Sequence, residues 1–166
     1  MKELPVRKNI RLRDYDYSQA GYYFITICVK DKHEMLGRIA VGDGVLDVPF
    51  IQLSEYGKIT DKHISSINSH YNHIEIQKYV IMPNHIHMIV VVECGTSRTP
   101  SPTNSTIPSL VSTLKRFVNK DCGFNMWQRS YHDHIIRNKE EYHRIQKYID
   151  ENPAKWESDC YFLKDI

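Results

Sequence analysis

Apolar and β-branched residues fill the segment 21–30 after a polar stretch, and this pattern predicts a first β-strand. Glycines and a proline then interrupt short β-prone pieces across 36–53, which indicates a hairpin or a loose pair of strands. Over 54–71 apolar residues recur at helical spacing, so a helix is expected there. The first part of the chain therefore predicts a strand, a hairpin and a helix.

The middle of the chain predicts two strands, 74–82 and 85–93, joined by a tight proline-asparagine turn. One parity of the second strand is wholly apolar: Ile86, Met88, Val90 and Val92. The other parity begins with His85 and His87. Because alternate side chains of a strand point to opposite faces, we expect one face to build the core and the other to present two imidazoles side by side.

The last part of the chain predicts two helices around one more strand. Serine, threonine and proline dominate 95–107, which indicates a flexible loop. A helix with an apolar stripe is expected over 108–120 and a strand over 126–137. The final helix, 138–153, is expected to begin with a capping box in which Asn138 caps the first turn.

With the hairpin set aside, the order of elements matches the split βαβ arrangement of ferredoxin-like folds. We therefore expect an α+β fold, in which helices cover one face of an antiparallel sheet and a further C-terminal helix follows. The length favours a single domain, 1–166, with a basic segment at 1–20. The second face of the sheet is expected to stay available for a ligand.

The formal net charge of +2 does not suggest a general polyanion binder, but the cations are clustered. The two clusters suit contacts with phosphate, although a solvated charged face is the alternative. Their members are Arg7, Lys8, Arg11, Arg13, Lys115, Arg116 and Lys120. The four cysteines lack CxxC spacing, which predicts free thiols in a reducing compartment. Without a signal-like or membrane-spanning apolar run, a cytoplasmic protein with no membrane contact is expected.

Two imidazoles alone do not make a metal site, and the final helix offers further groups. Tyr148 supplies a phenol that can act as a nucleophile, and Asn152 lies one turn later on the same side. The amide oxygen of Asn152 suits Mg²⁺ or Mn²⁺. Pro153 follows directly and is expected to bias Asn152 away from helical geometry. The alternative is that these residues have structural roles, in which the tyrosine packs in an amphipathic helix and the histidines form hydrogen bonds on a half-buried strand.

Three blocks, at 79–90, 127–138 and 148–153, carry these residues in order. The first contains His-Ile-His, the second Tyr-His-Asp-His-Ile-Ile-Arg and the third Tyr-Ile-Asp-Glu-Asn-Pro. Together with the basic segment 7–18, they resemble the HUH single-tyrosine transposases. The resemblance is greatest to the REP-associated tyrosine transposases, and it covers most of the chain.

The resemblance implies a role for each of these groups. His85 and His87 match the two metal-binding histidines, Tyr148 matches the nucleophile, and Asn152 occupies the position of a third polar ligand. A divalent cofactor, Mg²⁺ or Mn²⁺, and cleavage and rejoining of single-stranded or hairpin DNA through a 5′-phosphotyrosine are then expected. A monomer is favoured over a homodimer.

Some features stay open at this point. His132 and His134 form a second pair, for which the family pattern places no metal, and structural or DNA-contact roles are expected for them. A non-catalytic nucleic-acid-binding module on the same fold is one alternative function. A small zinc hydrolase is another, and it would need a third ligand and an open water position.

Overall fold

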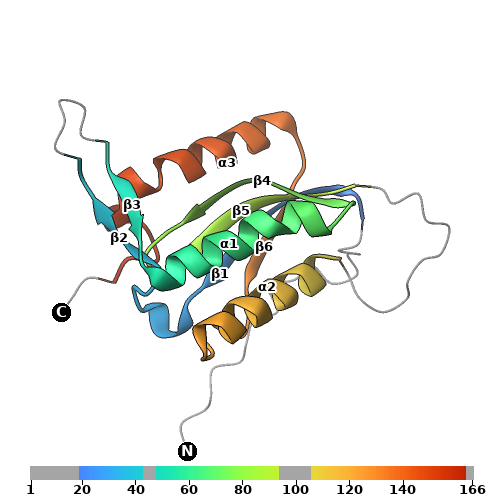
Figure 1. The fold of residues 1–166 in the computed structure, drawn as a ribbon. Helices are drawn as coiled ribbons and strands as arrows, with labels where there is room; N and C mark the ends of the chain where they lie inside the picture. Colours follow the sequence, from blue (N-terminus) through green and yellow to red (C-terminus); the bar gives the residue numbers. More distant parts are fainter. Residues whose placement is uncertain (1–18, 43–47, 94–105, 164–166) are drawn as a thin grey trace, which may run out of the picture.

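The computed structural model describes residues 19–42, 48–93 and 106–163. Its centre is a four-stranded antiparallel sheet in the order β4-β5-β1-β6 (Figure 1). The strands are β1 (Gly21–Cys28), β4 (Ile74–Ile81), β5 (His85–Val92) and β6 (His132–Ile136). Two strands that are far apart in sequence thus form the middle of the sheet, as in ferredoxin-like folds. The predicted fold class is confirmed.

A small second sheet lies at one end of this core and leads into the first helix. The predicted hairpin is present as β2 (Gly37–Ala40) and β3 (Phe50–Leu53). Helix α1 (Glu55–His70) follows and is capped by Ser54, whose hydroxyl oxygen accepts a hydrogen bond from the backbone amide of Gly57 at 3.1 Å. This N-cap satisfies one of the donors that the first turn of a helix leaves unpaired.

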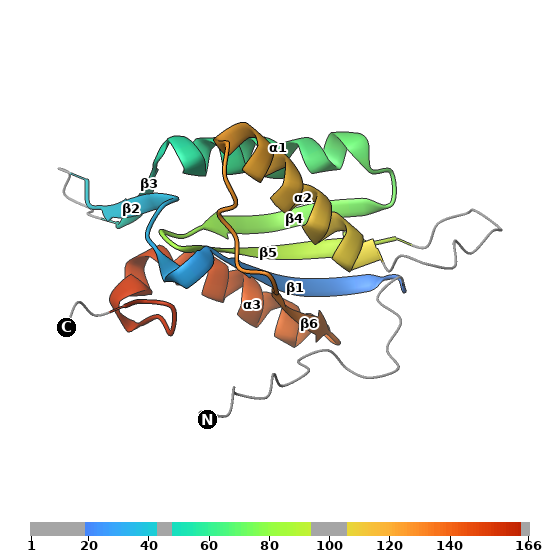
Figure 2. The same ribbon diagram turned by 90° about the horizontal axis from the view of Figure 1, so that it is seen from below.

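The helices divide between the two faces of the sheet (Figure 2). Helices α1 and α2 (Thr106–Cys122) cover one face, while α3 (Lys139–Glu151) lies on the other. The side chains between the sheet and the first two helices form the main core, and they include Tyr23, Ile25, Ile27, Ile86, Met88 and Val90. The second face of the sheet was expected to stay available for a ligand. Helix α3 occupies part of that face and brings Tyr148 to it.

A smaller apolar cluster fixes α3 to the sheet. Ile149 of α3 packs against Ile89 of β5 and Ile136 of β6, and all three are buried. At the start of the helix, Asn138 Oδ1 accepts a hydrogen bond from the backbone amide of Glu141 at 2.8 Å, so the predicted cap is present. The Glu141 carboxylate accepts a hydrogen bond from the backbone amide of Arg137 at 2.8 Å. In a standard capping box the donor would be the amide of the cap residue itself, Asn138, which is one residue later.

The end of α3 differs from the prediction. Asn152 keeps helical angles, with φ −58° and ψ −43°, so the expectation that Pro153 would displace it from helical geometry is wrong. The reason is that a short 3₁₀ helix, η2 (Pro153–Ser158), continues the winding of the chain. Proline is well tolerated at the first position of such a turn because its fixed φ is already helical. Asn152 therefore stays one turn beyond Tyr148.

Two other boundaries differ from the sequence-based prediction. The strand expected over 126–137 is ordered as β6 only over its last part, and the earlier Trp127 forms an isolated bridge with Val29 and is buried in the main core. Helix α2 begins two residues before the expected position, and the rest of the expected 95–107 loop lies outside the described residues.

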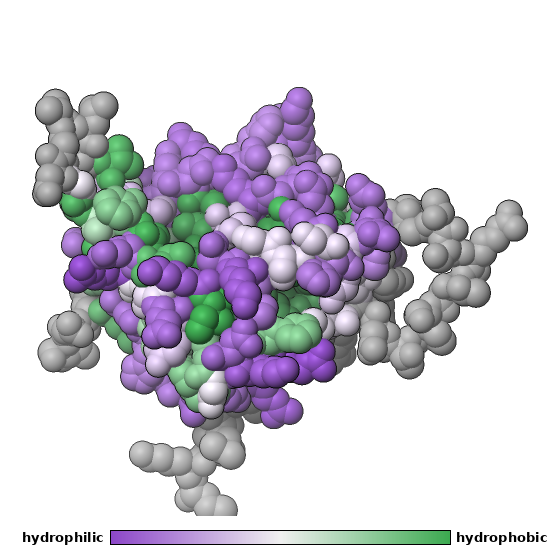
Figure 3. All heavy atoms as spheres, viewed as in Figure 1, coloured by the Kyte–Doolittle hydropathy of each residue, from purple (hydrophilic) through white to green (hydrophobic). Residues whose placement is uncertain are grey.

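Hydrophilic residues cover most of the face shown in Figure 3, and the hydrophobic surface there is broken into small areas. Among the helices that the structure describes, none has both the length and the apolar character needed to cross a membrane.

Candidate functional site

The two histidines of β5 lie on the face of the sheet that carries α3. His87 pairs with Thr26 of β1, and Thr26 pairs with His132 of β6, so these three side chains form a row across the sheet. Directly paired residues of antiparallel strands share a face. Both His85 and His87 are buried, while the intervening Ile86 points into the main core. The alternation expected from the sequence is therefore present.

Asn84 determines which nitrogen of His85 carries a proton. Its amide nitrogen donates to the backbone carbonyls of Lys32 and Tyr161, at 3.1 and 2.9 Å, which fixes the orientation of the amide. The amide oxygen then faces His85 Nδ1 at 2.8 Å. Because this oxygen can only accept, Nδ1 must be the donor and the Nε2 of His85 keeps a free lone pair. That lone pair is what a metal ligand requires.

His87 is oriented by a hydroxyl instead of an amide. Its Nδ1 lies 2.8 Å from Thr26 Oγ1, and its Nε2 lies 3.0 Å from Nε2 of His85. Burial is the main cause that lowers the pKa of each ring to about 3. Both imidazoles are therefore neutral near pH 7, with their Nε2 atoms facing each other.

The phenol of Tyr148 reaches this pair from α3. Its hydroxyl lies 3.2 Å from His87 Nε2, and the ring centroids are 5.2 Å apart. The side chain is 39% exposed, so a ligand can approach it from solvent. Burial, and then the negative charge of Asp159, raise the pKa of Tyr148 to about 12. In this environment the phenol is protonated near neutral pH.

Asp159 completes a group of side chains that could hold a metal ion, and the sequence did not reveal it. One ligand atom each from His85, His87 and Asp159 lies within 4.8 Å of the others. The carboxylate also accepts hydrogen bonds from Asn152 Nδ2 at 3.0 Å and from the Tyr148 hydroxyl at 3.4 Å. The amide of Asn152 therefore contacts the site through Asp159.

These residues fit a divalent metal ion. Asn152 is 2% exposed, and within the described part of the chain its Oδ1 is buried without a hydrogen-bond partner. An unpaired buried oxygen carries an energetic cost that a cation could offset. Two neutral imidazoles and a carboxylate form a mixed nitrogen and oxygen set, which suits Mn²⁺ and similar ions better than Mg²⁺, which prefers oxygen ligands alone.

Aromatic rings from the C-terminal segment enclose the histidines. The centroid of the His85 ring lies 4.4 Å from that of Tyr161 and 6.0 Å from that of Trp156. On the open side, a pocket of about 280 Å³ gives access to His87 and Tyr148. The imidazoles of His85 and His87 are thus shielded on one side, while the phenol borders the pocket.

The second histidine pair borders the same pocket. His132 and His134 both line it, and both are exposed. His134 Nε2 also lies 2.7 Å from a carboxylate oxygen of Glu141, which links β6 to α3. The structure places this pair beside Tyr148 and does not include it in the group of ligands formed by His85, His87 and Asp159.

A relative at the sequence level is a Haemophilus influenzae protein described as uncharacterized. It is 34% identical over 176 residues, which cover 95% of this chain and 93% of the relative. This chain belongs to the same family. No family model matches the chain.

A solved structure shows the fold that members of this family share with other proteins. A REP-associated tyrosine transposase bound to a REP hairpin has a TM-score of 0.65 and 23% sequence identity to this chain. The similar region covers 88% of this chain and 73% of that chain. At this identity the likeness shows the fold alone.

The predicted basic residues are only partly described by the structure. Arg7, Lys8, Arg11 and Arg13 lie outside the described residues. The Lys115 ammonium donates to the backbone carbonyls of Gln128 and Ser130, at 2.7 and 3.0 Å, and so holds the segment before β6. Arg116 packs over the ring of Phe117. Together with Lys120, these cations are on α2 and do not line the Tyr148 pocket.

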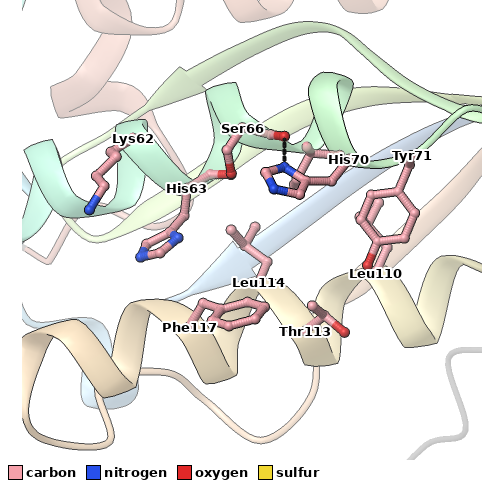
Figure 4. A pocket seen from close by; sticks show the side chains of 10 residues that line it. Lys62, His63, Ser66, His70, Tyr71, Leu110, Thr113, Leu114 and Phe117 are labelled. Carbon is pink, nitrogen blue, oxygen red and sulfur yellow. Dashed lines mark hydrogen bonds between the residues drawn. The ribbon is translucent and has the colours of Figure 1, made fainter.

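A pocket between α1 and α2 is a second place where a ligand could bind (Figure 4). Helices α1 and α2 lie on the opposite face of the sheet from α3, which carries Tyr148 (Figure 2). His63 stacks on Phe117 and lies 2.8 Å from an Asp121 carboxylate oxygen, while His70 Nδ1 lies 2.7 Å from the Ser66 carbonyl. Both histidines of this pocket are thus engaged in hydrogen bonds within the protein.

Sequence reasoning missed Asp159 and Thr26. Asp159 directly follows η2, and no spacing rule connects it to the histidines. Thr26 could have been found, because it is the polar residue among Tyr22, Phe24 and Thr26, which share one parity of β1. If β1 is paired with β5 so that this set of alternate residues lies on the same face as the histidines, the contact between Thr26 and His87 follows.

Proposed function

We propose that this protein cuts and rejoins single-stranded DNA next to hairpins, with Tyr148 as the nucleophile. The observation that carries the proposal is the 3.2 Å distance between the Tyr148 hydroxyl and His87 Nε2, at the edge of an open pocket. A phenol beside metal-ligand atoms is the arrangement that phosphoryl transfer to tyrosine requires. The fold shared with a REP-associated tyrosine transposase bound to a REP hairpin supports the same substrate class.

In the first step the Tyr148 oxygen attacks the scissile phosphorus. The bond between this oxygen and phosphorus forms while the bond from phosphorus to the 3′ oxygen breaks, and the 5′ phosphate stays on the tyrosine. The phenol loses its proton to solvent, and the departing 3′ oxygen takes one up. In the second step a DNA 3′ hydroxyl attacks the phosphotyrosine and restores the phenol. Each step exchanges one phosphodiester for another, so no nucleoside triphosphate is required.

The protein's own residues prepare this reaction. Thr26 and Asn84 orient the imidazoles so that both Nε2 atoms face the pocket side of β5. Ile149, on the next position of α3, anchors the helix that presents the phenol. A divalent ion held by His85, His87, Asp159 and Asn152 would supply Lewis-acid catalysis at the phosphoryl oxygens and would offset the charge of Asp159.

We also propose that Tyr148 acts within its own chain and that the protein works as a monomer. The phenol and His87 already lie within hydrogen-bond distance in one molecule. No second copy is needed to complete the group formed by the tyrosine, the histidines and Asp159.

A covalent-adduct assay tests the proposed function. The protein is incubated with labelled single-stranded and hairpin oligonucleotides and Mn²⁺, and adducts that resist SDS are resolved by electrophoresis. We expect adducts with the unaltered protein and none with Tyr148→Phe. Tyr71→Phe, which changes a tyrosine on the opposite face, is the matched control and should form adducts normally. Adducts that persist with Tyr148→Phe would show that another residue is the nucleophile.

A zinc hydrolase is the second candidate, because Asp159 supplies the third ligand that the sequence lacked. The position of the phenol argues against it, since Tyr148 already lies 3.2 Å from His87 Nε2 on the open side. A catalytic zinc site would keep that side for water. Hydrolysis products without any covalent adduct would favour the hydrolase.

A further inference from the structure

A second cavity opens on the α3 face, towards the beginning of α3. It has a volume of about 470 Å³, within the range of small-molecule sites. The residues that matter for its chemistry are Tyr22, Gln77, Arg137, Lys139 and Tyr142. None of the described residues that line it is acidic. The lining therefore combines aromatic rings with cations.

Two tyrosines form a rigid aromatic corner in this cavity. The ring of Tyr22 meets the edge of Tyr142 at a centroid distance of 5.4 Å and an angle of 76°. The Tyr142 hydroxyl donates to Gln77 Oε1 at 2.8 Å and accepts from Gln146 at 3.1 Å, so its ring is held in place. Tyr22 is 43% exposed, which leaves part of its ring open to a ligand.

Two exposed cations stand beside the aromatic corner. Arg137 precedes the cap of α3 and Lys139 is its first residue. Both side chains line the cavity, and neither has an ion pair with any residue in the described ranges. Exposed aromatic rings together with unpaired cations are the features by which proteins bind single-stranded nucleic acid.

The cavity and the Tyr148 pocket lie along one line on the sheet. Tyr22 in the cavity and Thr26 in the pocket share one parity of β1, four positions apart. Strand geometry makes that separation about 13 Å. On the neighbouring strand, the paired residues Ile136 and His132 follow the same line. At the B-form spacing of about 3.4 Å per nucleotide, 13 Å corresponds to roughly four nucleotides, and to fewer in an extended strand.

We propose that this cavity is a nucleotide subsite, in which an unpaired base stacks on Tyr22 and a neighbouring phosphate contacts Arg137 and Lys139. The proposal rests on the proposed function, since it assigns the cavity to the single-stranded DNA that Tyr148 cuts. The bound nucleotide lies a few positions from the scissile phosphate. A base within a duplex has no free face for Tyr22, so the subsite selects unpaired DNA.

Binding to two DNA probes tests the subsite. One is a DNA hairpin with a short oligothymidine flank, and the other is the same hairpin without a flank. Affinity is measured by fluorescence anisotropy in chelator, where cleavage does not interfere. We expect Tyr22→Leu to weaken binding of the flanked hairpin about tenfold, since stacking is lost. Binding of the unflanked hairpin should not change, and Tyr22→Phe, which keeps the ring, should behave as the unaltered protein.

A charge variant with a matched control gives a second measurement. Lys139→Ala should weaken binding of the flanked hairpin and reduce its salt dependence, because a phosphate contact is lost. Lys62→Ala removes the same charge on the opposite face and should change neither. No loss with Tyr22→Leu, or an equal loss on both probes, would overturn the subsite.

Cross-linking of the unaltered protein avoids any effect of substitution on folding. When 5-iododeoxyuridine replaces thymidine in the flank, irradiation should link the DNA to the peptide that contains Tyr22 or Tyr142. Cross-links confined to other peptides would overturn the proposal. The adduct assay on Tyr148 is independent of these measurements. If the unaltered protein forms adducts but Tyr22→Leu binds the flanked hairpin normally, only the subsite is rejected. If Tyr22→Leu binds the flanked hairpin more weakly but the unaltered protein forms no adducts, only the strand-cutting function is rejected.

Discussion

At the scale of single residues, Asn84 links the chemistry of His85 to the path of the backbone. Its amide spans two carbonyls, of Lys32 and Tyr161, that belong to distant segments. A side chain of this kind orients a metal ligand without touching the metal, and replacing it usually weakens metal binding. The neutral state of His85 therefore depends on burial, and its tautomer depends on Asn84.

The buried histidines predict a pH dependence of stability. The pKa of each ring is about 6.5 in the unfolded chain and about 3 in the folded protein. Below pH 6.5 the unfolded chain therefore binds more protons, so the free energy of unfolding falls as the pH decreases towards 3. Each ring contributes a slope of up to about 1.4 kcal/mol per pH unit.

Thermal unfolding in chelator at several pH values measures this slope. A double variant, with His85→Asn and His87→Asn, should show a flatter dependence than the unaltered protein. His33→Asn changes an exposed ring that has no ion pair with any residue the structure describes, and it serves as the control, with the slope of the unaltered protein. If the double variant kept the full slope, other groups would be responsible for the acid sensitivity.

Asp159 gives a second prediction at this scale. Replacing a charged ligand by a neutral amide of the same size lowers the affinity for a divalent cation, and we expect Asp159→Asn to weaken Mn²⁺ binding by about tenfold or more. Isothermal titration of the metal-free protein with Mn²⁺ measures this change. Asp150→Asn removes the same charge from an exposed position of α3 that pairs with Lys78, and it should bind Mn²⁺ normally. Equal affinities of the two variants would exclude Asp159 as a ligand.

The residues of the site differ in how far the sequence could predict them. The parity of β5 predicts that His85 and His87 share a face, and helical spacing places Asn152 one turn beyond Tyr148. Asp159 could not be predicted, because its position depends on how η2 folds back. The sequence also could not show that the Lys115 ammonium is bound by backbone carbonyls, since these come from a separate segment.

At the scale of elements, the close approach of α1 to the chain before β2 depends on Gly57. A Cβ at this position would overlap the backbone carbonyl oxygen of Leu36. Alanine normally favours a helix over glycine by about 1 kcal/mol. Here the overlap is with backbone, which cannot turn away as a side chain can, so the steric cost outweighs the gain in helix propensity.

We therefore expect Gly57→Ala to reduce the free energy of unfolding by about 1–3 kcal/mol or more. Gly42→Ala is the matched control, because a Cβ there would have no heavy atom within 4 Å, and it should change stability by less than about 0.5 kcal/mol. Urea denaturation measures both, and the slope should stay constant if the native state is unchanged. A Gly57→Ala protein as stable as the control would show that α1 can shift freely.

The order of strands and helices was predictable, but the side of the sheet on which α3 packs was not. Periodicity shows that α3 has an apolar stripe, and it does not show which surface the stripe covers. The structure resolves this by packing Ile149 against Ile89 and Ile136. The same limit explains why the ends of β6 were misplaced: Trp127 belongs to the core through a single bridge to Val29, which no local pattern reveals.

At the scale of the whole molecule, one chain contains both the phenol and the histidines. A complementation experiment tests whether they work together. Tyr148→Phe lacks the proposed nucleophile and His87→Ala lacks a proposed metal ligand, and each alone should form no adduct. A mixture of the two should remain inactive if the tyrosine acts within its own chain. Recovery of adducts in the mixture would show that two chains exchange their tyrosines.

The opposed faces of the sheet have one more consequence. Ile86 and His87 are neighbours in sequence, yet one lies in the interior and the other lines the pocket beside Tyr148. Inserting or deleting one residue in this strand would move the side chains beyond that point to the opposite face, so that an imidazole would enter the apolar interior or a core side chain would face the pocket. A substitution in this strand can therefore affect one face alone, whereas a change of its length would damage the core and the pocket together.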